Sequence, residues 1–362
     1  MGIKGEPASG LQGEGITLPV DLIRTVAIIL VILLHAATEG IPNLDIMSAQ
    51  GIQLWWTADV YNSISRVCVP LFIMLTGALL LQPSKVEEPL GVFFKKRWMR
   101  IGIPILFWAA VYFAWRFFVN GEVLTLSSIV QGVFTGPYYQ FWYLYVLVGL
   151  YLLTPVIRVV VAHAKWGTIK YFLVVWFLGT GLFPLLTLAV NLSVAVSFFL
   201  ITGLVGYFIL GAYVAQLRSR RWTLSLIFAL STLFTILGTF FLVGTLGESY
   251  SQFFLDASSF NVILASVALF LILASIPNQT LITRFPRGIR VLKIISENTL
   301  PIYLFEVIVL ETLQRGFLGF TISVATINPI LEMPLITAVT LGICLAVIVP
   351  LKKIPYVKQI IG

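Results

Sequence analysis

Two ionisable side chains in the first apolar segment have the types and the spacing to take part in chemistry. Arg24 and His35 both lie in the stretch VDLIRTVAIILVILLHA. On an α-helix, their separation of eleven residues places them about 20° apart in azimuth and about 16 Å apart along the axis. The arginine could hold an elongated anionic donor, and a neutral imidazole could accept a proton from a hydroxyl group. This segment therefore offers a candidate catalytic face.

Each of these residues also has a purely structural interpretation. Arg24 could anchor the helix at the membrane interface, and His35 could hydrogen-bond a neighbouring helix. Their placement on one face favours a joint functional role. Glu39, one turn beyond His35, could orient the imidazole or could be a solvated loop carboxylate.

A late apolar segment, TLPIYLFEVIVLETLQRGF, contains two carboxylates. Carboxylates inside a membrane span are costly and often act as proton carriers, bases or ion-pair partners. Glu306 is a candidate catalytic group on this basis. For Glu306 and Glu311 alike, pairing with Arg116 or Arg315 is an equally weighted structural alternative.

A basic cluster, FFKKRWMRIGIPILFW, leads into the third apolar segment. Lys96, Arg97 and Arg100 fall within about one helical turn and could cradle the phosphates of a cytosolic cofactor, since arginine offers bidentate geometry. The structural alternative is an ordinary cluster of cytoplasmic anchors that bind anionic lipid.

Four residues are candidates for binding an acceptor substrate: Glu39, introduced above, and Arg66, Trp142 and Tyr143. Arg66 is a basic residue at a boundary predicted to face outside, where the charge rule does not place one. Its structural alternative is a headgroup contact. Trp142 and Tyr143 begin the segment FWYLYVLVGLYLLTP, a position typical of an interfacial aromatic belt from which a few side chains could line a cavity.

The elements that must position these residues are membrane-spanning helices. The chain is 59% hydrophobic and only 10% charged, which leaves too few polar groups to cover a surface in water. Because the apolar runs are about 20 residues long and do not alternate with period two, they indicate an all-α helical bundle and not a barrel. About ten spans are predicted, at 18–37, 64–82, 101–119, 142–161, 169–190, 194–217, 222–244, 258–276, 298–316 and 331–351.

Charge alternates between the connecting loops. Acidic residues occupy the loops after odd-numbered spans, and basic residues occupy the loops after even-numbered spans and the tail. Positive charge marks the cytoplasmic side, so both termini are predicted to be cytoplasmic in a multi-pass plasma membrane protein. The same distribution argues against nucleic acid as a partner and for membrane lipid. The basic set comprises Lys85, Lys95, Lys96, Arg97, Arg100, Arg158, Lys165, Lys170, Arg218, Arg220, Arg221, Arg284, Arg287, Arg290, Lys293, Lys352, Lys353 and Lys358.

The segment boundaries follow from this topology. Residues 1–17 are predicted to form a cytoplasmic tail without a cleavable signal peptide, 18–351 the transmembrane domain and 352–362 a second cytoplasmic tail. Cys68 and Cys344 both lie inside apolar runs and are expected to be small core residues, and no metal site is expected.

The ordered series of motifs resembles the membrane-bound acyltransferase-3 family. Arg24 to His35 matches the family's R-x10-H in the first helix, and RVCVPLFIMLTG is similar to R-x-x-V-P-L-F-F-M-x-S-G with Thr76 replacing Ser. RWMRIGIP resembles R-x-x-R-I-x-x-P, and WYLYVLVGLYLLTP resembles W-[FY]-L-Y-x-L-x-G-L-Y-L-L-T-P. ISENTLPIYLF occupies the family's late serine-aromatic segment. The matches run in the expected order over most of the chain.

The resemblance implies acyl-CoA as the donor and a hydroxyl group of a glycan, lipid or similar surface molecule as the acceptor. It implies that His35 is the catalytic base, that Arg24 holds the donor, and that Arg97 and Arg100 meet the phosphates of CoA. The chain departs from the family at two histidine positions, which hold Gln140 and Glu306. These departures concern the acceptor side of the reaction.

The leading hypothesis is therefore O-acyl transfer, of acetyl in the first instance, from cytosolic acetyl-CoA to an acceptor hydroxyl at the outer half of the bilayer. Sequence leaves open direct transfer and a covalent acyl-histidine, as well as the oligomeric state. The rival class is a transporter of a glycan or small solute with Glu306 and Glu311 as proton carriers. A third hypothesis is a degenerate relative that serves as a binding component.

Overall fold

The structure is a computed structural model that describes residues 18–39, 49–190, 203–214, 217, 219–322 and 328–362. Helices make up nearly all of this described part, and it contains no strand, which confirms the all-α prediction. In order they are α1 (Val20–Glu39), α2 (Ala49–Ser65), α3 (Cys68–Leu80), α4 (Leu90–Arg97), α5 (Ile103–Phe118), α6 (Leu126–Thr135), α7 (Phe141–His163), α8 (Trp166–Trp176), α9 (Phe183–Val190), α11 (Gly203–Val214), α12 (Arg221–Leu246), α13 (Phe260–Ala274), α14 (Asn278–Arg284), α15 (Pro286–Glu297), α16 (Thr299–Gln314), α17 (Pro329–Leu351) and α18 (Pro355–Ile361).

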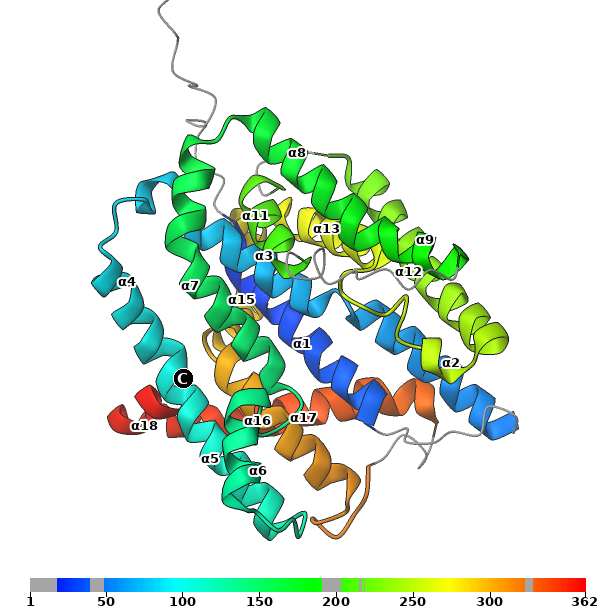
Figure 1. The fold of residues 1–362 in the computed structure, drawn as a ribbon. Coiled ribbons are helices and arrows are strands. Elements are labelled where there is room, and N and C mark those ends of the chain that lie inside the picture. Colours follow the sequence, from blue (N-terminus) through cyan, green and yellow to red (C-terminus); the bar gives the residue numbers. More distant parts are fainter. Residues whose placement is uncertain (1–17, 40–48, 191–202, 215–216, 218, 323–327) are drawn as a thin grey trace, which may run out of the picture.

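Helix α1 runs through the middle of the bundle (Figure 1). It contacts α2, α3, α13, α15, α16 and α17. Its apolar residues Ile23, Ala27, Ile28, Val31 and Ile32 are fully or almost fully buried, at the three-to-four-residue spacing of one helical face. Burial of this apolar face fixes the rotation of α1 about its axis. It therefore also fixes the directions in which Arg24 and His35 point.

Helices α3 and α11 cross at the closest approach that helices allow. A Cβ atom on Gly77 would lie 1.8 Å from the carbonyl oxygen of Phe208, and one on Gly211 would lie 2.0 Å from that of Met74. Small residues at such crossings let two backbones pack directly, as in membrane helix pairs. The crossing holds α3, which carries part of the candidate site, in a fixed place.

A π-helical turn, η3 (Trp98–Gly102), joins α4 to α5. Pro104 has no N–H to donate to the carbonyl of Arg100 four residues earlier, and a wider turn accommodates this missing hydrogen bond. The turn contains Arg100 and follows directly after Arg97. It therefore determines how these two predicted phosphate ligands are presented.

Among the described residues, seven helices or joined helices are long and apolar enough to cross a membrane, and eight if the bent pair α13–α14 forms one span. The predicted count of about ten remains a prediction. The predicted span 298–316 forms the 16-residue helix α16. The predicted span 194–217 is described from residue 203 onward, apart from residues 215 and 216.

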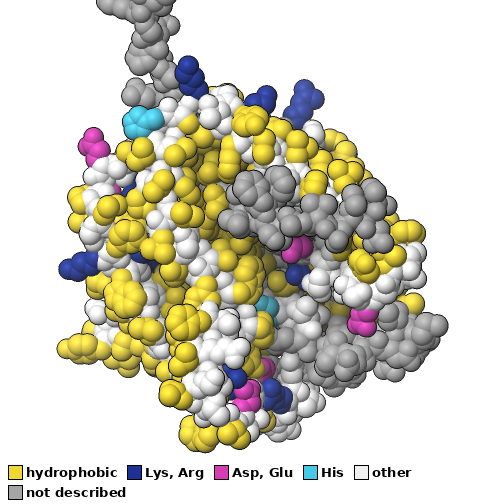
Figure 2. Space-filling model, viewed as in Figure 1, with side chains coloured by type: hydrophobic (Ala, Val, Ile, Leu, Met, Phe, Trp, Pro, Cys, Tyr) yellow, Lys and Arg dark blue, Asp and Glu magenta, His cyan; other side chains and the backbone are white. Residues whose placement is uncertain are grey.

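Two spans begin earlier than predicted. One runs from Gly51 to Leu80 and another from Leu90 to Phe118, whereas the sequence predicted starts at residues 64 and 101. The first of these spans was predicted to start too late because α2 contains buried polar side chains such as Asp59 and Asn62, which lower its hydropathy. The second was predicted to start too late because α4 contains basic residues. Hydrophobic side chains cover much of the surface seen in Figure 2, as expected for a surface that faces lipid.

Candidate active site

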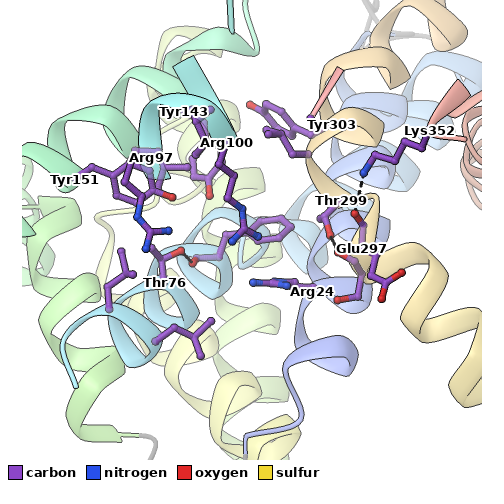
Figure 3. A pocket seen from close by; sticks show the side chains of 18 of the residues that line it. Arg24, Thr76, Arg97, Arg100, Tyr143, Tyr151, Glu297, Thr299, Tyr303 and Lys352 are labelled. Carbon is purple, nitrogen blue, oxygen red and sulfur yellow. Dashed lines mark hydrogen bonds between the residues drawn. The ribbon is translucent and has the colours of Figure 1, made fainter. Parts of the chain in front are cut away.

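Five cationic side chains line one cavity of about 400 Å³, here called the cationic cavity. They come from five different parts of the chain and converge on the same space, where the three arginines and Lys352 are visible in Figure 3. Helix α1 supplies Arg24, the end of α4 and the turn η3 supply two arginines, and two short connections supply the lysines. The five residues are Arg24, Lys85, Arg97, Arg100 and Lys352.

The positive charge of the cationic cavity is only partly balanced by the one acidic side chain in its lining, Glu297. None of the five cations forms an ion pair within the described part of the chain, and Glu297, which also lines the cavity, lies 3.9 Å from Lys293. Lys85 donates a hydrogen bond to the carbonyl oxygen of Leu79. Like charges that share a small space repel one another, so the cavity has an electrostatic preference for a ligand with several negative charges.

The pKa values of the two lysines reflect this crowding. Burial, with added repulsion from Lys358 and Arg100 and a partial offset from Glu297, lowers the pKa of Lys352 to about 8. Burial and the charges of nearby arginines also lower the pKa of Lys85. A bound anion would relieve both penalties.

Arg97 is held by aromatic rings and not by acids. Its guanidinium lies 5.2 Å from the ring centroid of Phe93 and 5.4 Å from that of Tyr151. Its buried Nε has no hydrogen-bond partner among the described residues. Stacking orients the planar group and leaves its Nε–H donor available to a ligand.

A second arrangement joins α1 to α16. His35 Nδ1 lies 2.5 Å from Glu306 Oε1, and the side chains are 12% and 0% exposed respectively. The ring of Tyr139 packs edge-on against His35, with centroids 5.3 Å apart. When Nδ1–H donates to the carboxylate, Nε2 is left to accept a proton, as a general base requires.

Several buried polar atoms around this His35–Glu306 pair lack hydrogen bonds within the described residues. They include Glu306 Oε2 and both amide atoms of the fully buried Gln140. Polar atoms left unpaired in a protein interior are costly and often mark a place where water or substrate binds. Gln140 and Glu306 are the two residues that occupy histidine positions of the family's motifs. Gln140 is linked to this site because its carbonyl accepts a hydrogen bond from Tyr303, one turn before Glu306.

The structure brings together some of the predicted site residues and separates others. His35 pairs with Glu306, while Arg24, Arg97 and Arg100 share the cationic cavity with Tyr143. Lys96 does not line the cavity and instead pairs with Glu88 at 2.8 Å. Glu39 ends α1, and its side chain lies outside the described residues.

The other predicted residues lie elsewhere. Arg66 donates to Gln252 at 2.9 Å, and Trp142 is 45% exposed; neither lines the cationic cavity. Glu311 pairs with Arg315 at 3.1 Å and accepts hydrogen bonds from two aromatic side chains, so it is engaged in structural contacts.

Sequence reasoning missed Lys85, Lys352 and Arg158 as parts of the site. All three counted as loop cations that set topology, and no local pattern distinguishes them from the others. Arg158 is 3% exposed and donates to the carbonyls of Leu80 and Lys85 and to Glu88. These contacts hold the connection that carries Lys85 against the cavity.

Within the described residues, no three His, Cys, Asp or Glu side chains are grouped as a metal site would require. Cys68 and Cys344 are buried and free. The described side chains offer anion binding in the cationic cavity and proton transfer at the His35–Glu306 pair.

The chain matches a known protein family. The family model for acyltransferase-3, described as an acyltransferase domain, matches residues 19–349. Neither the curated proteins nor the solved structures provided a match to the chain. The matched region contains His35, Glu306 and four of the five cations of the cavity; the fifth, Lys352, lies just beyond it.

Proposed function

Because the chain belongs to the acyltransferase-3 family of membrane acyltransferases, we propose that it transfers an acetyl group from cytosolic acetyl-CoA to a hydroxyl group of a cell-surface glycan or glycolipid. The observation that carries the proposal is the position of both functional groups on α1. Arg24 lines the cationic cavity. His35 lies about three turns further along the same helix and contacts the buried carboxylate of Glu306.

The cationic cavity supports a CoA donor. CoA carries several phosphate charges at one end and its thioester at the other, so it needs a multivalent cationic site that is separated from the reacting atoms. Arg97 and Arg100 offer bidentate geometry to phosphate, and the two lysines add point charges. The separation between Arg24 and His35 of about 16 Å suits an extended pantetheine arm.

The His35–Glu306 pair supports direct transfer. His35 Nε2 takes the proton of the acceptor hydroxyl while the oxygen of that hydroxyl attacks the thioester carbonyl carbon. The tetrahedral intermediate then collapses, the carbon–sulfur bond breaks, and the imidazolium returns the proton to the CoA thiolate. The buried Glu306 carboxylate holds the ring and stabilises the imidazolium, in the manner of the acid in a hydrolase triad. The products are an acetyl ester and CoA.

The orientation that we propose follows the positive-inside rule. The loops predicted to be cytoplasmic contain Lys85 and Arg100, which line the cationic cavity. The cavity would then open to cytosolic CoA in a plasma membrane protein with both termini inside. The acceptor would approach from the outer half.

The decisive test uses the two histidines of the chain. Membranes that contain the His35→Ala variant are supplied with labelled acetyl-CoA and extracted glycolipid, and His163→Ala serves as the matched control. His163 is exposed at the end of α7, where its ring nitrogen Nδ1 lies 2.9 Å from the carbonyl oxygen of Val159. We expect loss of transfer for His35→Ala alone. Undiminished transfer by that variant would refute the assignment.

Binding of the donor is tested separately. CoA should raise the thermal stability of the purified protein, because a ligand that binds only the folded state stabilises it. The shift should persist in His35→Ala and should fall in a double Arg97→Gln, Arg100→Gln variant. A shift that sugars cause and CoA does not would favour a transport or binding role.

A further inference from the structure

Two tyrosines form a wall of the cationic cavity, here called the tyrosine pair. Tyr143 comes from the first turn of α7 and Tyr303 from α16. Their ring centroids lie 5.4 Å apart at an angle of 66°, and both side chains line the cavity. Figure 3 shows them side by side along one border of it. The rings are close enough to leave little space between them.

This wall adjoins the His35–Glu306 pair. Tyr303 precedes Glu306 by one helical turn on α16, so the two side chains are neighbours on that helix. On the other side, Tyr139 lies in the turn that leads into α7 and packs against the His35 ring. Neither His35 nor Glu306 lines the cavity. The tyrosine pair thus adjoins both the cavity that would hold the donor and, through Tyr303, the Glu306 carboxylate that contacts His35.

The two rings differ in how firmly they are held. The Tyr303 hydroxyl donates a hydrogen bond of 2.5 Å to the carbonyl oxygen of Gln140, and its side chain is 5% exposed. The Tyr143 hydroxyl forms no hydrogen bond within the described part of the chain. Its ring is held by packing, with Phe72 at 6.2 Å between centroids. Tyr143, which is 7% exposed, is therefore the less firmly held member, and Tyr303 is the more firmly held one.

We propose that the tyrosine pair limits the length of the acyl group that reaches His35, with Tyr143 as the residue that determines this specificity. The inference rests on the proposed function and names its donor class, CoA thioesters of short acyl groups. Because the rings are in edge-to-face contact, they oppose the passage of a longer acyl chain more than that of an acetyl group. The cations bind the CoA portion regardless of the acyl group. A long-chain acyl-CoA consequently binds as an inhibitor and is transferred slowly.

The first test needs no variant. Acetyl-, butyryl- and hexanoyl-CoA are compared with the wild-type protein as donors and as competitors of labelled acetyl-CoA. We expect similar inhibition constants for the three and a fall in transfer rate of at least about tenfold from acetyl to hexanoyl, the scale on which pockets discriminate chain length. Equal transfer of acetyl and hexanoyl groups would overturn the proposal.

The second test assigns the effect to Tyr143. In Tyr143→Ala the ratio of hexanoyl to acetyl transfer should rise by about tenfold, whereas Tyr143→Phe should keep the wild-type ratio. The matched control is Tyr151→Ala, two turns further along α7, where the ring lines the same cavity beside Arg97. That variant should weaken binding of every donor and leave the ratio unchanged.

The outcomes separate this proposal from the function on which it rests. If no CoA thioester donates an acyl group to any acceptor, the proposed function fails. If acetyl transfer proceeds and the ratio in Tyr143→Ala stays at the wild-type value while CoA still stabilises the variant, only the length limit fails.

Discussion

The contact between His35 and Glu306 connects a partly exposed ring to a fully buried carboxylate. Glu306 is fully buried, and its Oε1 lies 2.5 Å from the imidazole. In such a pair the carboxylate sets the tautomer of the ring and stabilises its charged form during the reaction. The residue that replaces a family histidine thus acts through His35 in the proposed mechanism.

Removal of this carboxylate should slow the chemistry and spare donor binding. Glu306→Gln keeps the side-chain volume but allows the amide to favour the wrong tautomer, so we expect transfer to fall by about 10²-fold or more. The CoA-induced thermal shift should stay at the wild-type value. Glu311→Gln on the same helix is the control, because Glu311 contacts Arg315 and not His35. A Glu306→Gln variant with normal rates would exclude this role.

Lys352 should make donor binding depend on pH. Its pKa is lowered to about 8 by burial and by neighbouring positive charge, so it is protonated at neutral pH and loses its charge as pH rises. Because a phosphate binds the charged form, affinity for acetyl-CoA should fall up to about tenfold between about pH 7 and pH 9. In Lys352→Arg, the guanidinium stays charged and the fall should disappear. Equal pH dependence in both proteins would contradict the prediction.

At the scale of elements, Arg158 on α7 fastens the connection between α3 and α4. It donates to the carbonyl of Leu80 at 2.7 Å, to that of Lys85 at 3.1 Å and to Glu88 at 3.0 Å. Hydrogen bonds from Lys96 and Arg158 lower the pKa of Glu88, which keeps this carboxylate charged. The buried guanidinium therefore positions Lys85 without touching the donor itself.

Arg158→Met should loosen this connection. We expect a loss of about 2 kcal/mol or more in the free energy of unfolding, because buried carbonyls lose their donor. The KM for acetyl-CoA should rise while kcat changes little, and amide exchange should increase over residues 82–89. Lys96→Met is the control, since it removes only the exposed partner of Glu88. A fall in kcat at unchanged KM would show that Arg158 acts on the chemistry.

The sequence predicted those helices in which a few polar residues interrupt a long and regular run of apolar residues. The spacing from Arg24 to His35 predicted a candidate catalytic face of α1, and α1 is long and uninterrupted. The sequence could not predict that the carboxylate next to His35 comes from Glu306, which is 271 positions away. Nor could it separate Lys96 from Arg97, which differ by one position and therefore point in directions about 100° apart.

At the scale of the whole molecule, the orientation in the membrane can be tested with the native cysteines in place. Cys68 and Cys344 are buried, so an impermeant maleimide should not label the wild-type protein. Glu248 and Arg284 are exposed on connections predicted to lie outside and inside respectively. Intact cells should therefore label Glu248→Cys, and only permeabilised cells should label Arg284→Cys. Reversed labelling would place the cationic cavity on the outer side.

The uninterrupted α1 helix has a consequence for which donors can react at all. Its backbone keeps Arg24 and His35 about 16 Å apart whatever the rest of the bundle does. A thioester on a truncated carrier, such as acetyl-cysteamine, can occupy the space near His35 but cannot reach the cations at the same time. Such a minimal donor should be used poorly, and its rate should not respond to substitution of Arg97 or Arg100. The length of the carrier molecule thus becomes part of substrate recognition.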